Sequence, residues 1–250
     1  MSNTLATTLG DEARAEAAAL FLPQVSPRSS NESGYIDLLD PNSNSRIGEK
    51  MFRSKFVVSI YERPWRPIAG RLLFGRRWKS SEERRVVMEK LDVQPEDNAL
   101  DVCCGPGNYT RPLAKAAHRG IAIGIDMSET MVASGARQGG GSNLAYVRGD
   151  AEKLPFESGR FDVACCINAI HMLRSPMAAL DEMMRVLAPG GRLLIAALCA
   201  KGNVPFTVGA YTLFGRDAFT TPLRENGFVQ IEQQINQRAQ IVSARRPVEG

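Results

Sequence analysis

The sequence predicts an α/β fold built on a doubly wound, mostly parallel sheet. From residue 98 onward, short and almost entirely apolar runs alternate with amphipathic segments. Strands covered by helices on both faces read as continuous apolar runs, so this alternation is typical of a parallel sheet. Two strand-like runs near the C-terminus are separated by little more than a turn, which predicts an antiparallel hairpin at one edge of the sheet. We therefore expect seven strands with helices on both faces of the sheet.

The expected elements follow one another in a regular order. Helices are expected after each of the first strands, and Ser128 is placed to cap one of them. The predicted strands span residues 99–104, 121–126, 144–150, 161–170 and 192–198, with the hairpin at 229–236 and 239–247. The predicted helices span residues 81–90, 109–117, 128–138 and 176–187.

The chain divides into three predicted parts. Residues 1–48 combine an Ala-rich stretch, which favours a helix, with turn-rich segments, and we expect a partly disordered N-terminal tail. Residues 49–90 form an N-terminal helical cap or lid, and residues 91–250 form the core. Removing residues 1–48 is expected to leave that core folded.

The composition narrows the class of protein. The 250 residues are 44% hydrophobic and carry a net charge of +4, which is enough apolar surface for a core and too little charge to indicate nucleic acid. No apolar stretch approaches the roughly 20 residues that span a bilayer. The five cysteines have neither disulfide nor metal-site spacing, so we expect reduced thiols and a cytoplasmic location.

A glycine turn follows the first apolar run, in the segment LDVCCGPGNYT from Leu100 to Thr110. Gly105 and Gly107 permit positive φ and let the backbone approach a ligand with no Cβ in the way. The next apolar run ends in Asp126, where a carboxylate can accept hydrogen bonds from both hydroxyls of a ribose. The pairing predicts a nucleoside cofactor. A tight strand–helix connection with no ligand is the alternative interpretation.

Two residues argue against a dinucleotide. The dinucleotide fingerprint needs a third glycine for close helix–strand packing, and Thr110 stands in that position. Asp101 adds negative charge beside the turn, which repels a pyrophosphate and attracts a cation. S-adenosylmethionine carries a sulfonium and an ammonium group and no phosphate, so it suits these residues.

At this point the chain resembles the class I S-adenosylmethionine-dependent methyltransferases. Their first motif reads roughly D-x-G-C-G-x-G, and the segment GDAEKLPF from Gly149 to Phe156 is similar to their G-D-A-x-x-L-P-F pattern. The resemblance covers residues 87–247 and includes the ubiquinone and menaquinone biosynthesis enzymes. It implies a Rossmann-like fold. Cys103 stands where the family usually has glycine, and Pro106 where it usually has threonine or serine.

The resemblance also implies roles for single residues. Met127 packs on the adenine ring, Asp150 accepts from the adenine amino group, and the Ala151 amide reaches a ring nitrogen. Capping of its own loop is the alternative role for Asp150. The predicted cofactor-binding residues are Asp101, Cys103, Gly105, Gly107, Asp126, Met127, Asp150, Ala151 and Asn168.

Asn168 and His171 follow the fourth apolar run. The resemblance implies that Asn168 faces the methionine part of the cofactor. The unperturbed pKa of histidine suits proton transfer, so His171 is the candidate general base, with support of the loop as its alternative role. The run Asn168-Ala169-Ile170-His171 lacks the prolines and aromatic residue found in enzymes that methylate nucleic-acid bases, which disfavours that substrate. The sequence has no cluster of His, Asp and Glu residues of the kind that indicates a catalytic metal, so no metal is predicted.

Aromatic and basic residues are interleaved between Arg53 and Lys79. A lid over the substrate pocket is the first interpretation, because a helical segment before the core is the usual lid in the family that the chain resembles. A peripheral contact with anionic lipid comes second, and nucleic acid comes last. The predicted substrate-binding residues are Tyr61, Trp65, Phe206 and Tyr211.

The sequence therefore predicts transfer of a methyl group from S-adenosylmethionine to an O, N or C nucleophile of a small organic acceptor by in-line displacement. Such a site needs alignment of the reactants and exclusion of water more than an elaborate acid–base system. Two alternatives remain: a regulatory protein that binds the cofactor without turnover, and a methyltransferase for a lipid-like acceptor at the membrane surface.

Overall fold

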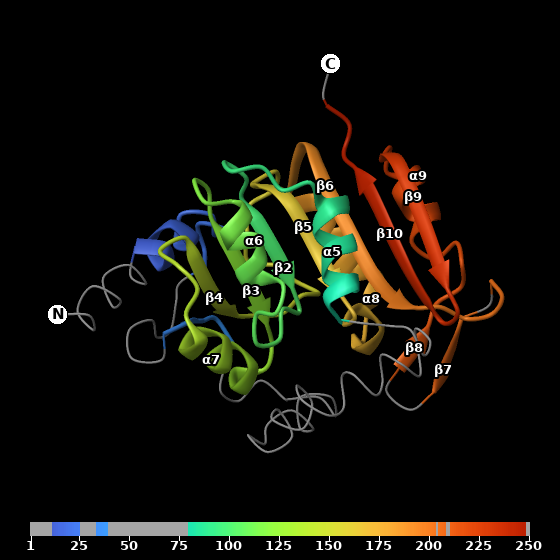
Figure 1. The fold of residues 1–250 in the computed structure, drawn as a ribbon, viewed down its shortest axis with the longest axis horizontal. Helices are drawn as coiled ribbons and strands as arrows, with labels where there is room; N and C mark the ends of the chain where they lie inside the picture. Colours follow the sequence, from blue (N-terminus) through green and yellow to red (C-terminus); the bar gives the residue numbers. More distant parts are fainter. Residues whose placement is uncertain (1–11, 26–33, 40–79, 204, 209–210, 249–250) are drawn as a thin grey trace.

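The computed structural model describes residues 12–25, 34–39, 80–203, 205–208 and 211–248. Eight strands within these residues form one sheet (Figure 1). They are β1 (Ile36–Asp37), β2 (Ala99–Val102), β3 (Ala122–Asp126), β4 (Leu144–Arg148), β5 (Phe161–Ile167), β6 (Leu187–Leu198), β9 (Val229–Asn236) and β10 (Ala239–Arg245).

The strands of this sheet lie in the order β1-β4-β3-β2-β5-β6-β10-β9. All neighbouring pairs from β1 to β6 in this order are parallel, whereas β10 runs antiparallel to both β6 and β9. The predicted doubly wound, mostly parallel sheet with an antiparallel edge hairpin is confirmed. The count of seven strands is corrected to eight, because the two-residue strand β1 joins the sheet beside β4.

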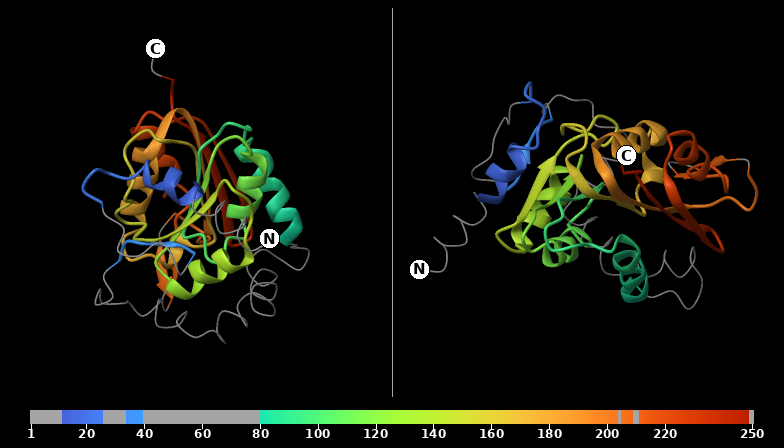
Figure 2. Two further views of the ribbon diagram at one scale, coloured as in Figure 1. Left: turned by 90° about the vertical axis from the view of Figure 1, so that its left-hand side faces the viewer. Right: turned by 90° about the horizontal axis from the view of Figure 1, so that it is seen from above.

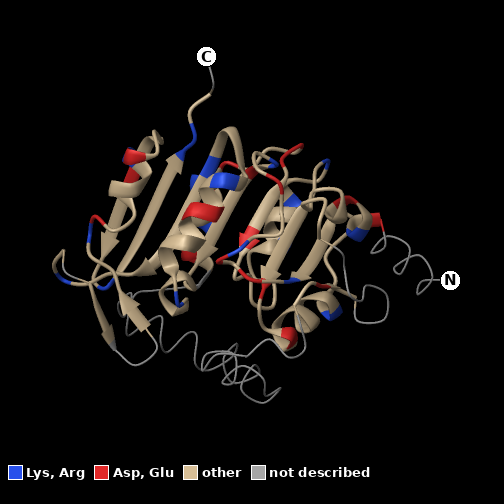
Figure 3. Cartoon of the chain, turned by 180° about the vertical axis from the view of Figure 1, so that it is seen from behind, with Lys and Arg blue, Asp and Glu red and all other residues tan. Residues whose placement is uncertain are grey.

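Helices cover both faces of the sheet, as the right-hand view of Figure 2 shows. On one face lie α5 (Ser80–Leu91), α6 (Thr110–Ala116) and α7 (Glu129–Gln138), and on the other lie α8 (Pro176–Val186), α9 (Thr220–Glu225) and a helix over residues 12–18. Seen from behind in Figure 3, acidic and basic residues lie mostly on helices, loops and strand ends. The four helices predicted at residues 81–90, 109–117, 128–138 and 176–187 are found close to those positions.

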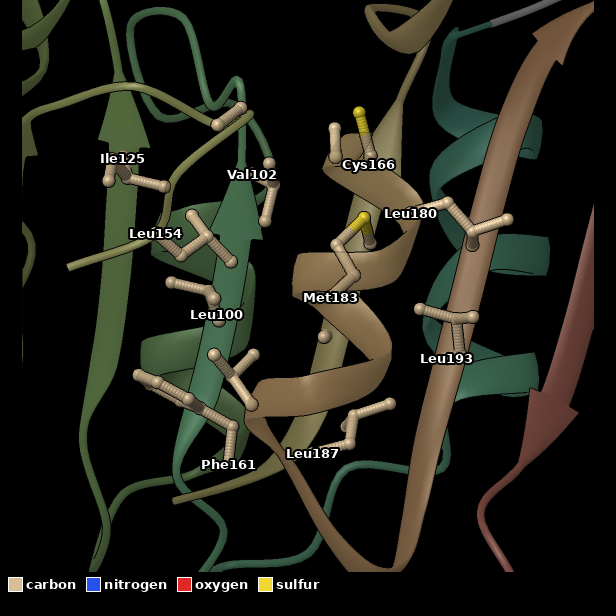
Figure 4. Packing of buried hydrophobic residues seen from close by; sticks show 14 of the residues in the cluster. Leu100, Val102, Ile125, Leu154, Phe161, Cys166, Leu180, Met183, Leu187 and Leu193 are labelled. Atoms are coloured by element: carbon tan, nitrogen blue, oxygen red, sulfur yellow. The ribbon is translucent and has the colours of Figure 1, made fainter. Parts of the chain in front are cut away.

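Side chains along each strand point alternately to the two faces of the sheet, so the core consists mainly of two large apolar clusters, one on each face. Leu100 and Val102 of β2 belong to the cluster beneath α8, whereas Ala99 belongs to the cluster beneath α5 and α6. Figure 4 shows Leu180 and Met183 of α8 over the first of these clusters. Successive strand side chains point to opposite faces, so Asp101 points toward the α6 side.

Residues 12–25 and 34–39 are part of the core. Ala13 and Ala17 are 0% exposed, Phe21 is 6% exposed, and the Phe21 ring lies 5.3 Å from that of Phe156. Asp37 of β1 forms an ion pair of 3.1 Å with Arg148 at the end of β4. Apolar side chains in the Ala-rich stretch thus complete the cluster beneath α8.

A second, two-stranded sheet joins β7 (Phe206–Val208) to β8 (Tyr211–Leu213) after β6. The backbone of Phe214 brings this sheet back to the main sheet, because its amide donates to Leu198 and its carbonyl accepts from Ala200. The sequence analysis did not predict these strands. Strand β8 lies close to the short 3-10 helix η2 (Ile170–Met172).

Candidate functional site

The predicted site residues gather at the carboxyl ends of the parallel strands, which lie at the lower edge of the sheet in Figure 1. The glycine turn follows β2, Asp126 ends β3, Asp150 follows β4, and Asn168 and His171 follow β5. Chain order reverses at β2, which has β3 on one side and β5 on the other. In doubly wound sheets, ligands bind outside the carboxyl ends of the strands at such a reversal.

Asp126 ties the glycine turn to the end of β3. Its Oδ2 accepts from the Gly105 amide at 2.8 Å, and its Oδ1 accepts from the Ser128 amide at 2.9 Å. Ser128 caps α7, since its Oγ accepts from the Met131 amide at 3.4 Å, as predicted. These two backbone donors fix the orientation of the carboxylate at the end of β3. Each carboxylate oxygen can accept more than one hydrogen bond, which is the property that binding of ribose hydroxyls requires.

The two glycines of the turn have different surroundings. Gly107 has φ of +80°, and a Cβ there would lie 1.9 Å from Tyr146 Oη, so only glycine fits this close approach. Arg111 closes the turn by donating to the Pro106 carbonyl at 2.7 Å and to Tyr146 Oη at 3.3 Å. By contrast, a Cβ on Gly105 would meet no heavy atom of the described residues within 4 Å. The space over Gly105 is where a ligand has room to approach the backbone.

Cys103 lies in a backbone conformation that favours glycine, with φ of +58°. A left-handed conformation costs a non-glycine residue roughly 1–2 kcal/mol. This strain explains why glycine suits the position in the family that the chain resembles. Burial raises the pKa of the Cys104 and Cys165 thiols nearby, so these side chains stay un-ionised.

Asp101 lies beneath the turn. It is 2% exposed, and the Thr110 hydroxyl donates to its Oδ2 at 2.6 Å. Burial, opposed by the Thr110 hydrogen bond and reinforced by the charge of Asp126, raises the pKa of Asp101 to about 7. A carboxyl group with this pKa changes its charge readily when a cation approaches.

Asp150 caps its own loop, because its Oδ1 accepts from the Glu152 amide at 2.9 Å. Ala151, beside it, is buried, and Met127 lies half-buried at the end of β3. The Met127 carbonyl accepts from Arg148 Nε at 3.3 Å. Arg148 thereby links this part of the edge to Asp37 of β1, a connection that sequence reasoning missed.

Asn168 adopts φ of +56°, a left-handed conformation that asparagine tolerates better than most residues. Its Nδ2 donates to Glu83 Oε1, and its buried Oδ1 has no hydrogen-bond partner among the described residues. Glu83, on the first turn of α5, is only 7% exposed. Sequence reasoning missed Glu83. Glu83, Val87 and Leu91 follow one another at four-residue intervals, so Glu83 is an acidic residue on a buried helical stripe.

His171 lies in η2 and is 6% exposed. Its Nδ1 is buried with no hydrogen-bond partner in the part of the chain that the structure describes. Burial lowers the pKa of His171 to about 4, so the imidazole is neutral at pH 7. Its ring centroid lies 5.7 Å from that of Tyr211 in β8. The structure thus brings the predicted base next to one predicted substrate-binding residue.

The other predicted substrate-binding residues are Phe206, Tyr61 and Trp65, and only the first lies among the described residues. Phe206 of β7 is 45% exposed. Tyr61 and Trp65 lie outside the described residues, as does the basic aromatic stretch from Arg53 to Lys79. Over the described ranges, no group of three or more His, Cys, Asp or Glu side chains has a geometry that holds a metal ion. Nor does any helix there have the length and apolar character needed to cross a membrane.

Comparison with known proteins finds similarity to methyltransferases. Residues 100–195 match a protein family described as a methyltransferase domain. The chain is 38% identical to the demethylmenaquinone methyltransferase of Staphylococcus saprophyticus over 126 residues. This aligned segment covers 50% of this chain and 52% of that protein. The chain spans about half the length of the curated relatives it matches.

Solved structures share the fold at lower identity. An S-adenosylmethionine-dependent methyltransferase from Aquifex aeolicus superposes with a TM-score of 0.56 at 20% identity, covering 75% of this chain and 96% of the other. The [4+2]-cyclase SpnF superposes with a TM-score of 0.58 at 19% identity, covering 67% of this chain and 82% of the other. Because the second of these is named a cyclase, the fold alone does not define the chemistry.

Residues 100–195 are therefore similar in sequence to a methyltransferase domain, and the fold around them is one that solved S-adenosylmethionine-dependent methyltransferases share.

Proposed function

We propose that this chain binds S-adenosylmethionine at the carboxyl ends of β2 to β5 and methylates a small quinone-type acceptor in its reduced form. The observation that carries the proposal is the link between Asp126 and the Gly105 amide, with open space over Gly105. The curated relatives named demethylmenaquinone methyltransferases support the class of acceptor. When bound, the cofactor supplies an electrophilic methyl group on its sulfonium, which an electron-rich ring oxygen or carbon attacks in line.

The residues of the edge suit the cofactor in charge and in hydrogen bonding. In this proposal, Asp126 accepts the ribose hydroxyls, and Asp150 and the Ala151 amide read the adenine ring, with Met127 packed on it. Asp101, Cys103, Gly105 and Gly107 form the floor and wall of the site. Among the described residues, no donor reaches the buried Oδ1 of Asn168, and the ammonium group of the cofactor can supply one. The proposed site therefore binds a cation more readily than a pyrophosphate.

His171 is the proposed base. Its imidazole is neutral at pH 7 and its Nδ1 has no partner among the described residues, so it can accept a proton from an acceptor hydroxyl as the methyl group is transferred. Tyr211, beside His171, and Phe206 on the same hairpin provide aromatic surface for a planar acceptor. Tyr61 and Trp65 are proposed to cover the acceptor from the lid.

Titration calorimetry with S-adenosylmethionine, and separately with NADH, tests the cofactor. We expect micromolar binding of the first alone, followed by a mass gain of one methylene when a reduced naphthoquinone is added with the cofactor. Cofactor binding without turnover on quinols, phenols or lipid-like acceptors would favour the regulatory alternative. Turnover that requires anionic vesicles would favour the membrane-surface alternative.

Asp126→Ala is expected to weaken binding of S-adenosylmethionine by about 1–3 kcal/mol, roughly 5- to 150-fold, because hydrogen bonds to a charged group are lost. Asp181→Ala is the matched control, since Asp181 is an exposed carboxylate on α8. Calorimetry measures both affinities, and the thermal midpoint of each variant reports whether it folds. Unchanged affinity in Asp126→Ala would remove the ribose assignment.

His171→Gln is expected to lower turnover by roughly 10²-fold, the lower end of general-base effects, because a base of such low pKa is weak. Affinity for S-adenosylmethionine is expected to stay within twofold of wild type. Since the pKa of His171 is about 4, the wild-type rate is not expected to fall through its protonation between about pH 6 and pH 9. Normal turnover of the variant over that range would contradict the role as a base.

A further inference from the structure

Glu83 is a buried acid brought to the proposed site by a helix outside the matched region of residues 100–195. Val87 and Leu91 are fully buried in the cluster beneath α5. Val87 lies one helical turn and Leu91 two helical turns further along the chain from Glu83. The same face of the helix therefore buries Glu83. The chain enters α5 at the lower edge of Figure 1, so its first turn lies beside the carboxyl end of β5.

Burying a carboxylate is costly unless hydrogen bonds compensate for its lost hydration. One of these bonds comes from the Asn168 amide, which donates to Glu83 Oε1. This bond fixes the orientation of the Asn168 amide group, because Nδ2 turns toward the carboxylate. Oδ1 is then buried as an acceptor with no donor among the described residues. Such an unpaired buried acceptor is unfavourable, so a ligand that donates a hydrogen bond to it removes that cost on binding.

The charges around Asn168 favour a cationic ligand. Glu83, Asp101 and Asp126 provide carboxyl groups at this edge, while burial keeps His171 neutral at pH 7. Of the described residues at this edge, Arg111 is engaged by the Pro106 carbonyl and Arg148 by Asp37. A positive group next to Asn168 therefore meets a negative field in a partly desolvated place, where charge interactions are strong.

We propose that Glu83 is a positioning residue for the cofactor. Through the amide of Asn168, it turns Oδ1 toward the α-ammonium group of S-adenosylmethionine and adds a negative charge behind it. This inference rests on the proposed function and adds to it a specificity for the amino-acid part of the cofactor, set by a residue of the cap helix. The adenosine part is bound independently, by residues after β2, β3 and β4.

Glu83→Gln tests the inference through three ligands. S-adenosylmethionine and S-adenosylhomocysteine carry the α-ammonium group, whereas 5′-methylthioadenosine lacks the amino-acid part. We expect the variant to bind the first two about tenfold more weakly, equivalent to one lost charge-assisted contact, and to bind 5′-methylthioadenosine as wild type does. Glu89→Gln is the matched control, because Glu89 is an exposed acid on the same helix. All affinities are measured by calorimetry on the full chain.

Asn168→Gly provides the second variant if Glu83→Gln does not fold, because glycine adopts the left-handed conformation of residue 168 without strain. It is expected to show the same selective loss. Equal weakening of all three ligands would assign Glu83 a purely structural role and overturn the inference, as would wild-type affinity for all three. If the wild-type chain binds none of the ligands, the proposed function itself fails, which is a separate result.

Discussion

Raising the pH from about 4 to about 7 is expected to destabilise the wild-type protein by about 3 kcal/mol relative to its Asp101→Asn variant. The pKa of Asp101 is about 7 in the folded protein, while the ordinary value applies to the unfolded chain. Over this range the folded state holds one more proton than the unfolded state. The stabilisation of the folded state by this extra proton is complete below the ordinary carboxyl pKa. It is lost as the pH rises through 7. Asparagine cannot titrate, and its side-chain oxygen still accepts from Thr110.

His171 is expected to make the folded protein less stable as the pH falls, which is the opposite of the effect of Asp101. Burial lowers its folded pKa to about 4, so its contribution is complete above about pH 6.5 and is lost as the pH falls toward 4, by about 3 kcal/mol. Between these pH values the two groups offset each other in the wild-type protein. The Asp101→Asn variant therefore reveals the full loss of stability in acid that belongs to His171.

Denaturant unfolding at several pH values, without cofactor, measures both effects. Asp181→Asn serves as the control, because it makes the same substitution at an exposed position of α8. A constant difference between wild type and Asp101→Asn from pH 4 to pH 7 would show that Asp101 is ionised throughout. We also expect cofactor binding near pH 7 to release a proton, because a cation near Asp101 lowers its pKa.

Phe21→Ala is expected to lower the free energy of unfolding by about 3–5 kcal/mol, as truncation of a buried phenylalanine leaves a cavity. Phe21 is 6% exposed and packs against Phe156 in the cluster beneath α8. The backbone on both sides of it is bonded to the core, through Leu22 to Pro155 and through Leu20 to Glu157. The N-terminal segment is therefore expected to unfold together with the sheet.

Phe206→Ala is the matched control for stability, because Phe206 is 45% exposed and its loss should change stability by no more than about 0.5 kcal/mol. Calorimetric or denaturant unfolding of both variants distinguishes the two environments. A small effect at Phe21 would support the original expectation that residues 1–48 can be removed without loss of the core.

The sequence predicted the parts of the fold that repeat a simple period. The seven strands and the helices between them have continuous apolar runs or helical stripes, and each is found close to its expected place. The two residues of β1 are too few to show a pattern, and Phe21 carries no signal until its partner Phe156 is known. The hairpin of β7 and β8 also lacks a pattern, because short strands that lie outside the main sheet show little alternation.

For the site, sequence predicted the residues that follow strand ends, because all strand ends of a parallel sheet meet at one edge. It did not predict Glu83, since the first-turn position of this residue is a common place for an acid at a helix N-terminus. Burial of that carboxylate depends on how α5 docks against β6, and docking is a tertiary property. The low pKa of His171 likewise follows from burial and not from residue type.

The short strand β1 has a consequence for association between copies of this chain. A sheet edge with unpaired amides and carbonyls is a template for aggregation. At one edge of the sheet, most side chains of β9 are polar and exposed. One of them is Glu232, which forms an ion pair with Lys90. At the other edge every residue of β4 is buried, and β1 lies along its last two residues. Truncation before residue 40 would expose this apolar edge, so we expect the shortened chain to self-associate even under conditions where it remains folded.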